Sequence, residues 1–184
     1  MNKNKILGIM TMLCVIIVSA VPAFAASSSS TQTAQVTVSD TIAIAGTWAG
    51  GGNNSTINLG SLPADGLQAT FNGGASGEQI FTYSNVAIDV YTKASGDFAG
   101  GIPADTITIN NFLWSNGTST PAAFTTGYTG AKVLNNIAKA PKSGSTAYPV
   151  NLYLTVPVGT NSGSYSTTVY FSAVKTGAAA PTTP

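Results

Sequence analysis

Apolar residues recur at every second position through much of the chain, a pattern typical of β-strands that bury one face. Val36, Val38, Ile42 and Ile44 share one face of the first such segment, residues 34–45, and mainly polar residues occupy the other. The alternation recurs at residues 56–59, 79–83, 86–91 and 106–109, each bounded by glycine, asparagine or proline. We therefore predict an all-β fold, an antiparallel Greek-key β-sandwich of immunoglobulin-like or jelly-roll type, with a closed barrel as the alternative.

The clearest alternation lies near the C-terminus. Residues 150–156 and 165–173 each place apolar side chains on one face, and the residues between them favour turns. This spacing predicts a long hairpin. Residues 112–114, followed by Asn116 and Gly117, predict a shorter strand that meets a turn. Residues 131–140 fit either a helix or a strand, and we favour a strand that ends in a loop.

The N-terminus has the layout of an export signal. Lys3 and Lys5 precede an apolar run at residues 6–18, and Ala-Phe-Ala ends at Ala25 as a signal peptidase would require. We predict a signal peptide over residues 1–25, helical over residues 5–24 and detached from the rest. A retained membrane anchor, a pilin-type helix and a lipidated cysteine are weaker alternatives. The protein is accordingly expected to be secreted to the cell surface, without membrane contact after cleavage.

The rest of the chain is predicted to consist of a leader, one domain and a tail. Residues 26–33 are rich in serine and threonine and are predicted to form a flexible leader. Residues 34–176 are expected to form a single β-sandwich domain, because about 150 residues can bury one adequate core without a disulfide. Residues 177–184 are small and contain proline, and we expect a disordered tail there.

Charge is scarce, which excludes several functions. The 184 residues contain 7 basic and 6 acidic side chains, no histidine and one cysteine, and that cysteine lies in the predicted signal peptide. So few cations do not form a nucleic-acid interface. Because histidine and a mature thiol are missing, we expect no catalytic residues, no cofactor and no resident metal. A calcium ion near Asp97 and Asp105 is a minor alternative, and both acids are more simply interpreted as turn residues.

A few side chains are candidates for surface contacts. Trp48 and Trp114 are possible glycan contacts, although aromatic residues of a sandwich core are more common. Asn53, Asn54 and Asn116 begin sequences that fit the N-glycosylation pattern. Glu78 is the sole glutamate, and an isopeptide bond that involves Lys93 is a minor possibility.

The run from Val156 to Tyr165 reads Val-Pro-Val-Gly-Thr-Asn-Ser-Gly-Ser-Tyr. It resembles the Val-Pro-x-Gly-Thr-x-x-Gly-x-Tyr turn found in many immunoglobulin-like domains of prokaryotic surface proteins. With the strand at residues 86–91, the layout is similar to that of small secreted archaeal and bacterial β-sandwiches, some of which polymerise into filaments. The resemblance implies a structural role at the cell surface.

The first strand suggests a mechanism for such a role. Residues 34–45 follow a flexible leader, so this strand can leave its own sheet and pair in the next subunit through Val36, Val38, Ile42 and Ile44. A head-to-tail contact that does not close produces a filament. The expected partner is the protein itself or another cell-envelope component. The alternative function is a monomeric adhesion or carbohydrate-binding module.

Overall fold

The computed structural model describes residues 32–117, 119–128 and 132–182. The chain separates into two units, one that ends at Val38 and one that begins at Ser39, and every described strand belongs to the second. The predicted signal peptide and its helix lie outside the described residues. In the described part of the chain, no helix is long and apolar enough to cross a membrane.

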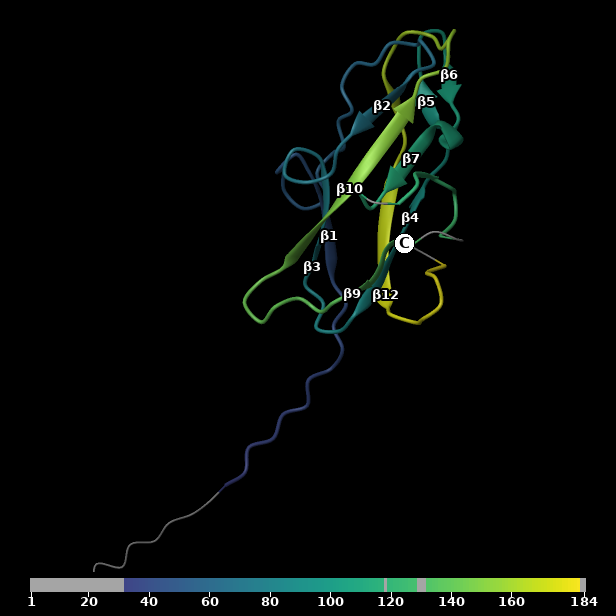
Figure 1. Ribbon diagram of the computed structural model, residues 1–184. Coiled ribbons are helices and arrows are strands. Elements are labelled where there is room, and N and C mark those ends of the chain that lie inside the picture. The colour runs from purple at the N-terminus through teal and green to yellow at the C-terminus, as the bar shows by residue number, and fades with distance from the viewer. Residues whose placement is uncertain (1–31, 118, 129–131, 183–184) are drawn as a thin grey trace, which may run out of the picture. The chain divides into compact units, whose positions relative to one another are not determined.

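The largest sheet is antiparallel and is organised around its longest strand, β10 (Figure 1). Its strands run in the order β1 (Ile44–Trp48), β3 (Glu78–Thr82), β10 (Thr146–Thr155), β7 (Phe112–Ser115) and β8 (Ala122–Ala123), and β2 (Gln68–Phe71) also pairs with β10. β3 pairs with the first half of β10, while β2 and β7 both pair with its second half. Val150, Leu152 and Leu154 are buried on one face of β10, as their alternation predicts.

Two smaller antiparallel sheets complete the fold. One has the order β12 (Val169–Lys175), β4 (Ile88–Ala94) and β9 (Lys132–Ile137), and the other has the order β11 (Tyr165–Ser166), β5 (Phe98–Gly100) and β6 (Asp105–Ile107). The helical content of the described residues is one short 3-10 turn, η1 (Ile109–Asn111). The predicted all-β class and antiparallel pairing are confirmed.

A single hydrophobic core joins the sheets in a sandwich-like arrangement. Ile80 and Leu152 from the large sheet and Ile88 and Val90 from β4 are all fully buried within it. Three phenylalanines extend the core across the sheets. Phe112 of β7 stacks on Phe124 at a centroid distance of 4.4 Å and meets Phe98 of β5 edge-on at 5.2 Å.

Several strand predictions are confirmed. The strands predicted at residues 79–83, 86–91, 106–109 and 112–114 correspond to β3, β4, β6 and β7, and residues 131–140 contain β9, a strand as favoured. Residues 56–59 form no strand, so that prediction is wrong. The strand predicted at residues 34–45 is also wrong for most of its length, because the first sheet pairing begins at Ile44.

The predicted C-terminal hairpin is wrong. β10 pairs with β2, β3 and β7, whereas β11 pairs with β5 and β12 pairs with β4. Residues 157–164 therefore cross from one sheet to another instead of joining two neighbouring strands. Alternation identifies a strand and its buried face, but the choice of partner depends on contacts far apart in sequence.

The turn at residues 102–105 fixes this crossing segment. Asp105 accepts hydrogen bonds from the main-chain amides of Thr106 and Asn161, at 2.7 and 3.0 Å, and these amides hold the pKa of its carboxyl below the ordinary value. The Asn161 side chain donates to the carbonyl of Pro103, and the Tyr165 hydroxyl donates to the carbonyl of Asn161. The turn role inferred for Asp105 is consistent with these bonds.

Asp89 of β4 is a buried residue whose carboxylate bonds to several segments of the chain. It is fully buried and accepts hydrogen bonds from Lys132 Nζ at 2.7 Å, from the Asn136 amide at 2.7 Å and from the Gly177 amide at 3.4 Å. These bonds link β4, the irregular pairing of β9 and the turn that follows β12. Burial opposes ionisation, but the ion pair and the two amides outweigh it and lower the pKa of Asp89.

We predict that Asp89→Ala lowers the free energy of unfolding by about 3 kcal/mol, because it leaves an ammonium group and two amides without their acceptor. Urea denaturation at neutral pH measures the loss. The contribution of Asp89 is present above its unfolded pKa and is lost as the pH falls through its lowered native pKa.

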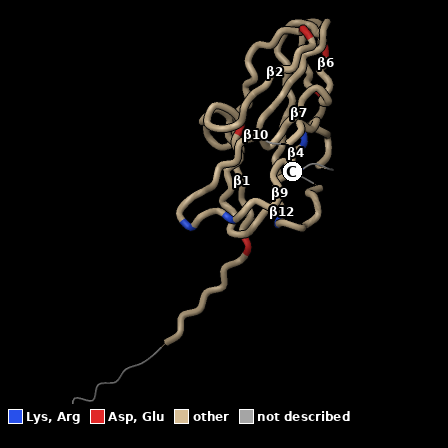
Figure 2. The backbone as a smooth tube through the Cα atoms, viewed as in Figure 1, with Lys and Arg blue, Asp and Glu red and all other residues tan. Residues whose placement is uncertain are grey.

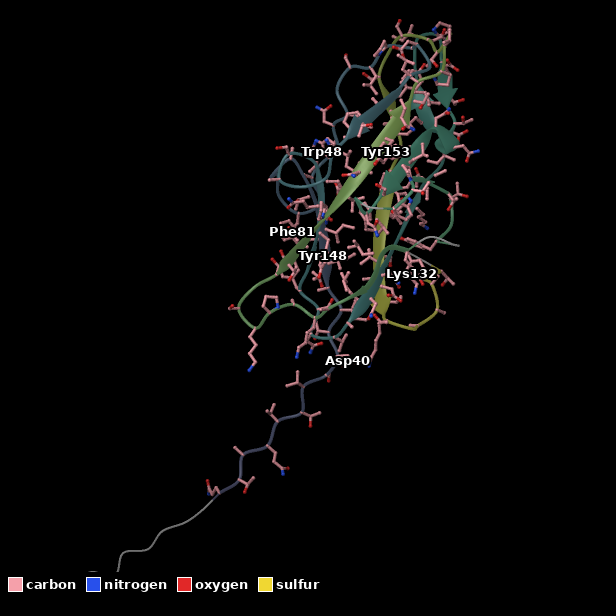
Figure 3. The ribbon with its side chains drawn as sticks, viewed as in Figure 1. Asp40, Trp48, Phe81, Lys132, Tyr148 and Tyr153 are labelled. Atoms are coloured by element: carbon pink, nitrogen blue, oxygen red, sulfur yellow. The ribbon has the colours of Figure 1, made fainter. Side chains whose placement is uncertain are left out.

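Asp40→Ala is the matched control. Asp40 also pairs with a lysine at 2.7 Å, but both partners, Asp40 and Lys175, are more than half exposed. Figure 3 labels Asp40 together with Lys132, the partner of Asp89. Exposed pairs contribute little to stability, so equal losses for the two variants would contradict the role given to Asp89.

Candidate functional site

A groove of about 1200 Å³ opens within the unit that begins at Ser39. We call it the edge groove. It is lined by residues 44–46 of β1, residues 54–62, Ala64, Glu78, Phe98, Ile107, Leu154, Val156, residues 160–169 and Phe171. Its volume exceeds the range of about 300–1,000 Å³ common for small-molecule pockets, so it has room for a larger occupant.

Strands with one unpaired edge line this groove. Among the described strands, β1 pairs only with β3, β11 only with β5 and β12 only with β4. β1 and β12 approach each other where a Cβ on Gly46 would lie 3.6 Å from the ring of Phe171. Residues 51–55 cover part of the β1 edge, because Asn54 donates its amide to the Gly46 carbonyl and Ser55 Oγ accepts from the Trp48 amide.

The lining of the edge groove combines apolar side chains with about as many polar ones, mostly serine, threonine and asparagine. Its hydrophobic side chains include Ile44, Ile57, Leu59, Leu154, Val169 and Phe171. No lysine or arginine is among its lining residues, and Glu78 supplies the sole carboxyl group. Elsewhere in this unit the few charged residues are spread along the chain (Figure 2), and four of them form the ion pairs of Asp89 with Lys132 and of Asp40 with Lys175. The groove therefore offers an occupant apolar contacts and uncharged hydroxyl and amide partners, but no cation.

Glu78 sits on β3 with its carboxyl in the groove. Only 2% of the residue is exposed, because it alternates with the buried residues Ile80 and Thr82. Its Oε1 would lie 3.0 Å from a Cβ on Gly46, so glycine leaves this carboxyl the space it occupies. No hydrogen bond or ion pair to this carboxyl is found within the described part of the chain. Burial raises the pKa of Glu78 to about 8.

The isopeptide interpretation of Glu78 is not supported by this geometry. Lys93 lies on the face of β4 opposite to the buried residues Val90 and Ala94. Its Nζ is 4.8 Å from the ring centre of Tyr128 and 5.2 Å from that of Tyr170. The Lys93 ammonium is therefore held by aromatic rings on the outer side of its sheet, whereas Glu78 faces the inner side of its own.

Residues 32–38 are exposed and belong to no strand. Val36 and Val38 are 88% and 75% exposed, with threonine between them. They are two of the four residues predicted to exchange between subunits. Both valines of this short segment are therefore exposed among the described residues.

The other two predicted exchange residues lie in the folded unit. Ile42 is 40% exposed, and Ile44 begins β1 and pairs with Thr82. The preceding residues are also tied down, because Asn85 accepts from the Thr41 amide and donates to the Ser39 carbonyl. A strand exchange would accordingly involve the chain up to Val38 and leave β1 in place.

The remaining candidate residues differ in how exposed they are to solvent. Trp114 is 5% exposed within the core, a position that offers little surface for a glycan, and Trp48 is half-buried beside Phe71. Figure 3 labels Trp48 at the end of β1. Asn53, Asn54 and Asn116 are exposed, and Asn54 lines the edge groove. No group of three or more potential metal-ligating residues occurs within the described ranges, and Asp97 accepts the Ile109 amide.

The edge groove itself was missed by the sequence analysis. The sequence held one signal for it: Glu78 lies two residues before Ile80, so it shares the core-facing side of this strand although it is an acid. Comparison with known proteins adds no assignment: no protein-family model, curated protein or solved structure matches the chain.

We predict that Glu78 makes the folded protein less stable as the pH rises. The native state keeps a proton up to about pH 8, whereas the unfolded state loses it near pH 4.5. Between these values the free energy of unfolding should fall by about 1.4 kcal/mol per pH unit. Glu78→Gln should remove this slope, and thermal or urea denaturation across the pH range measures it. An unchanged slope in the variant would show that Glu78 does not titrate in this way.

Proposed function

We propose that this protein is an exported, non-enzymatic structural subunit that assembles at the cell surface by strand exchange. Residues 32–38 of one copy insert into the edge groove of the next. The observation that carries the proposal is a match within one chain: an uncovered apolar segment, and a groove lined by unpaired strand edges. The resemblance of residues 156–165 to surface-protein domains agrees with this function.

The chemistry of the two partners is complementary. Residues 26–38 contain no charged side chain, and the groove has no basic residue and one carboxyl whose pKa is raised. Val36 and Val38 would exchange water for contacts with the apolar part of the lining, and full burial of a valine side chain is worth about 1.5–3 kcal/mol. Main-chain hydrogen bonds to an open strand edge would add directionality.

The geometry of such a contact favours a polymer. The donor and acceptor are different surfaces of the same chain, so each added copy leaves one free donor and one free groove. A Greek-key sandwich of immunoglobulin-like type is part of the proposal, supported by the crossing of residues 157–164 between sheets. Other cell-envelope components are the secondary partners. Carbohydrate binding is the alternative function, and of the two tryptophans only Trp48 is placed to serve it.

We predict that Val36→Asp with Val38→Asp prevents assembly of the chain that starts at Ala26. The two carboxylates would lose water in a groove that contains no cation, so the concentration needed for polymers should rise at least about 100-fold. Light scattering and negative-stain electron microscopy measure the effect. Deletion of residues 26–38 should do the same and spare β1, which begins at Ile44.

Gln35→Asp with Thr37→Asp is the matched control. It adds the same charge to the same segment, but on the face that alternates away from the valines. This control should retain assembly because its carboxylates stay in water. Polymers formed equally well by the valine variant and the deletion variant would refute the strand-exchange function.

A further inference from the structure

We propose that the carboxyl group of Glu78 couples strand insertion to a proton, so that the edge groove accepts the strand when Glu78 is neutral and rejects it when Glu78 is ionised. The inference rests on the proposed function and adds a regulatory device to the same site. It makes assembly favourable at neutral and acidic pH and unfavourable in alkaline conditions.

The first support is the position of the carboxyl. Glu78 is 98% buried and lines the groove beside Gly46 of the β1 edge and Phe171 of β12. An inserted strand would displace the water that still reaches this opening. The charged form of a carboxyl loses most from such a change, because the lining contains no lysine or arginine to compensate for the lost water.

The second support is the set of groups around Glu78. β1 and residues 54–64 contain no titratable residue. Tyr165 is the other titratable residue of the lining, and its hydroxyl donates to the Asn161 carbonyl. On β12, Tyr170 lies against Lys93, and Lys175 is paired with Asp40 at 2.7 Å. On β10, Tyr148 and Tyr153 lie outside the groove lining. None of these groups neutralises an ionised Glu78.

The third support comes from the incoming strand. Residues 26–38 bring neither lysine nor arginine, so insertion buries an ionised Glu78 without a counter-charge. A neutral carboxyl can instead donate its proton to a main-chain carbonyl of the inserted strand. The neutral form therefore gains a hydrogen bond on insertion, and the ionised form loses hydration. This difference is the physical basis of the coupling, and the raised pKa of Glu78 agrees with it.

The test measures assembly from about pH 6 to about pH 9.5 at constant ionic strength. For the wild-type chain that starts at Ala26, the critical concentration for polymers should stay level below about pH 8. Above it, the concentration should rise by up to about tenfold per pH unit, as expected for one proton bound per insertion. Light scattering gives the concentration, and electron microscopy confirms the polymers.

Three variants make the test specific. Glu78→Gln keeps the shape and polarity of the side chain but cannot ionise, so its critical concentration should change less than threefold over the same range. Glu78→Met, which is apolar and of similar length, is the second variant in case the amide disturbs folding. Asp65→Asn removes an exposed carboxylate instead and should retain the full wild-type response.

The outcomes separate this inference from the function on which it rests. If the Glu78 variants assemble with the same pH response as wild type, or if wild type shows no response, the proton coupling is wrong while strand exchange stands. If wild type forms no polymers at any pH, strand exchange fails and the coupling fails with it. A response lost only in the Glu78 variants supports both.

Discussion

Unpaired strand edges are the constraint on which the structure of this protein depends. Packing the sheets around one core satisfies the apolar faces, but it leaves β1, β11 and β12 each with a single strand partner in the described chain. All three contribute residues to one groove. Open edges are ready templates for another strand, and proteins usually protect them with charge, proline or a covering segment. Here residues 51–55 cover only part of β1.

The sequence predicts individual strands better than their partners. Period-two alternation identifies β3, β4, β6 and β10, because which face is buried is a local property of the residues. It does not show that β10 and β12 lie in different sheets, since that choice depends on contacts between residues far apart in sequence. The edge groove is hidden for the same reason: it combines β1, the segment before β2 and the residues after β10.

Two buried carboxyl groups illustrate how position decides the role of an acid. Asp89 has a lysine and two main-chain amides around it, so its charged form is favoured and the carboxylate holds three segments together. Glu78 is almost as far removed from solvent, but no cation or main-chain amide bonds to its carboxyl among the described residues, so burial favours its neutral form. The hydrogen bonds of Asp89 are complete within the folded unit. The carboxyl of Glu78 has no such partners there, and the proposed strand exchange would supply one.

The proposed strand exchange gives a physical reason for the small number of charged residues. Charged side chains along β1, along residues 54–64 or at the valine positions of residues 32–38 would protect the monomer against association, but they would also disfavour insertion of that segment into the groove. The chain has none at these positions, and Lys175 at the far end of β12 is paired with Asp40. A protein selected to remain monomeric would place charges here at little cost to its core. The lack of lysine and arginine in both residues 32–38 and the groove lining is compatible with the proposed strand exchange, in which these two surfaces meet.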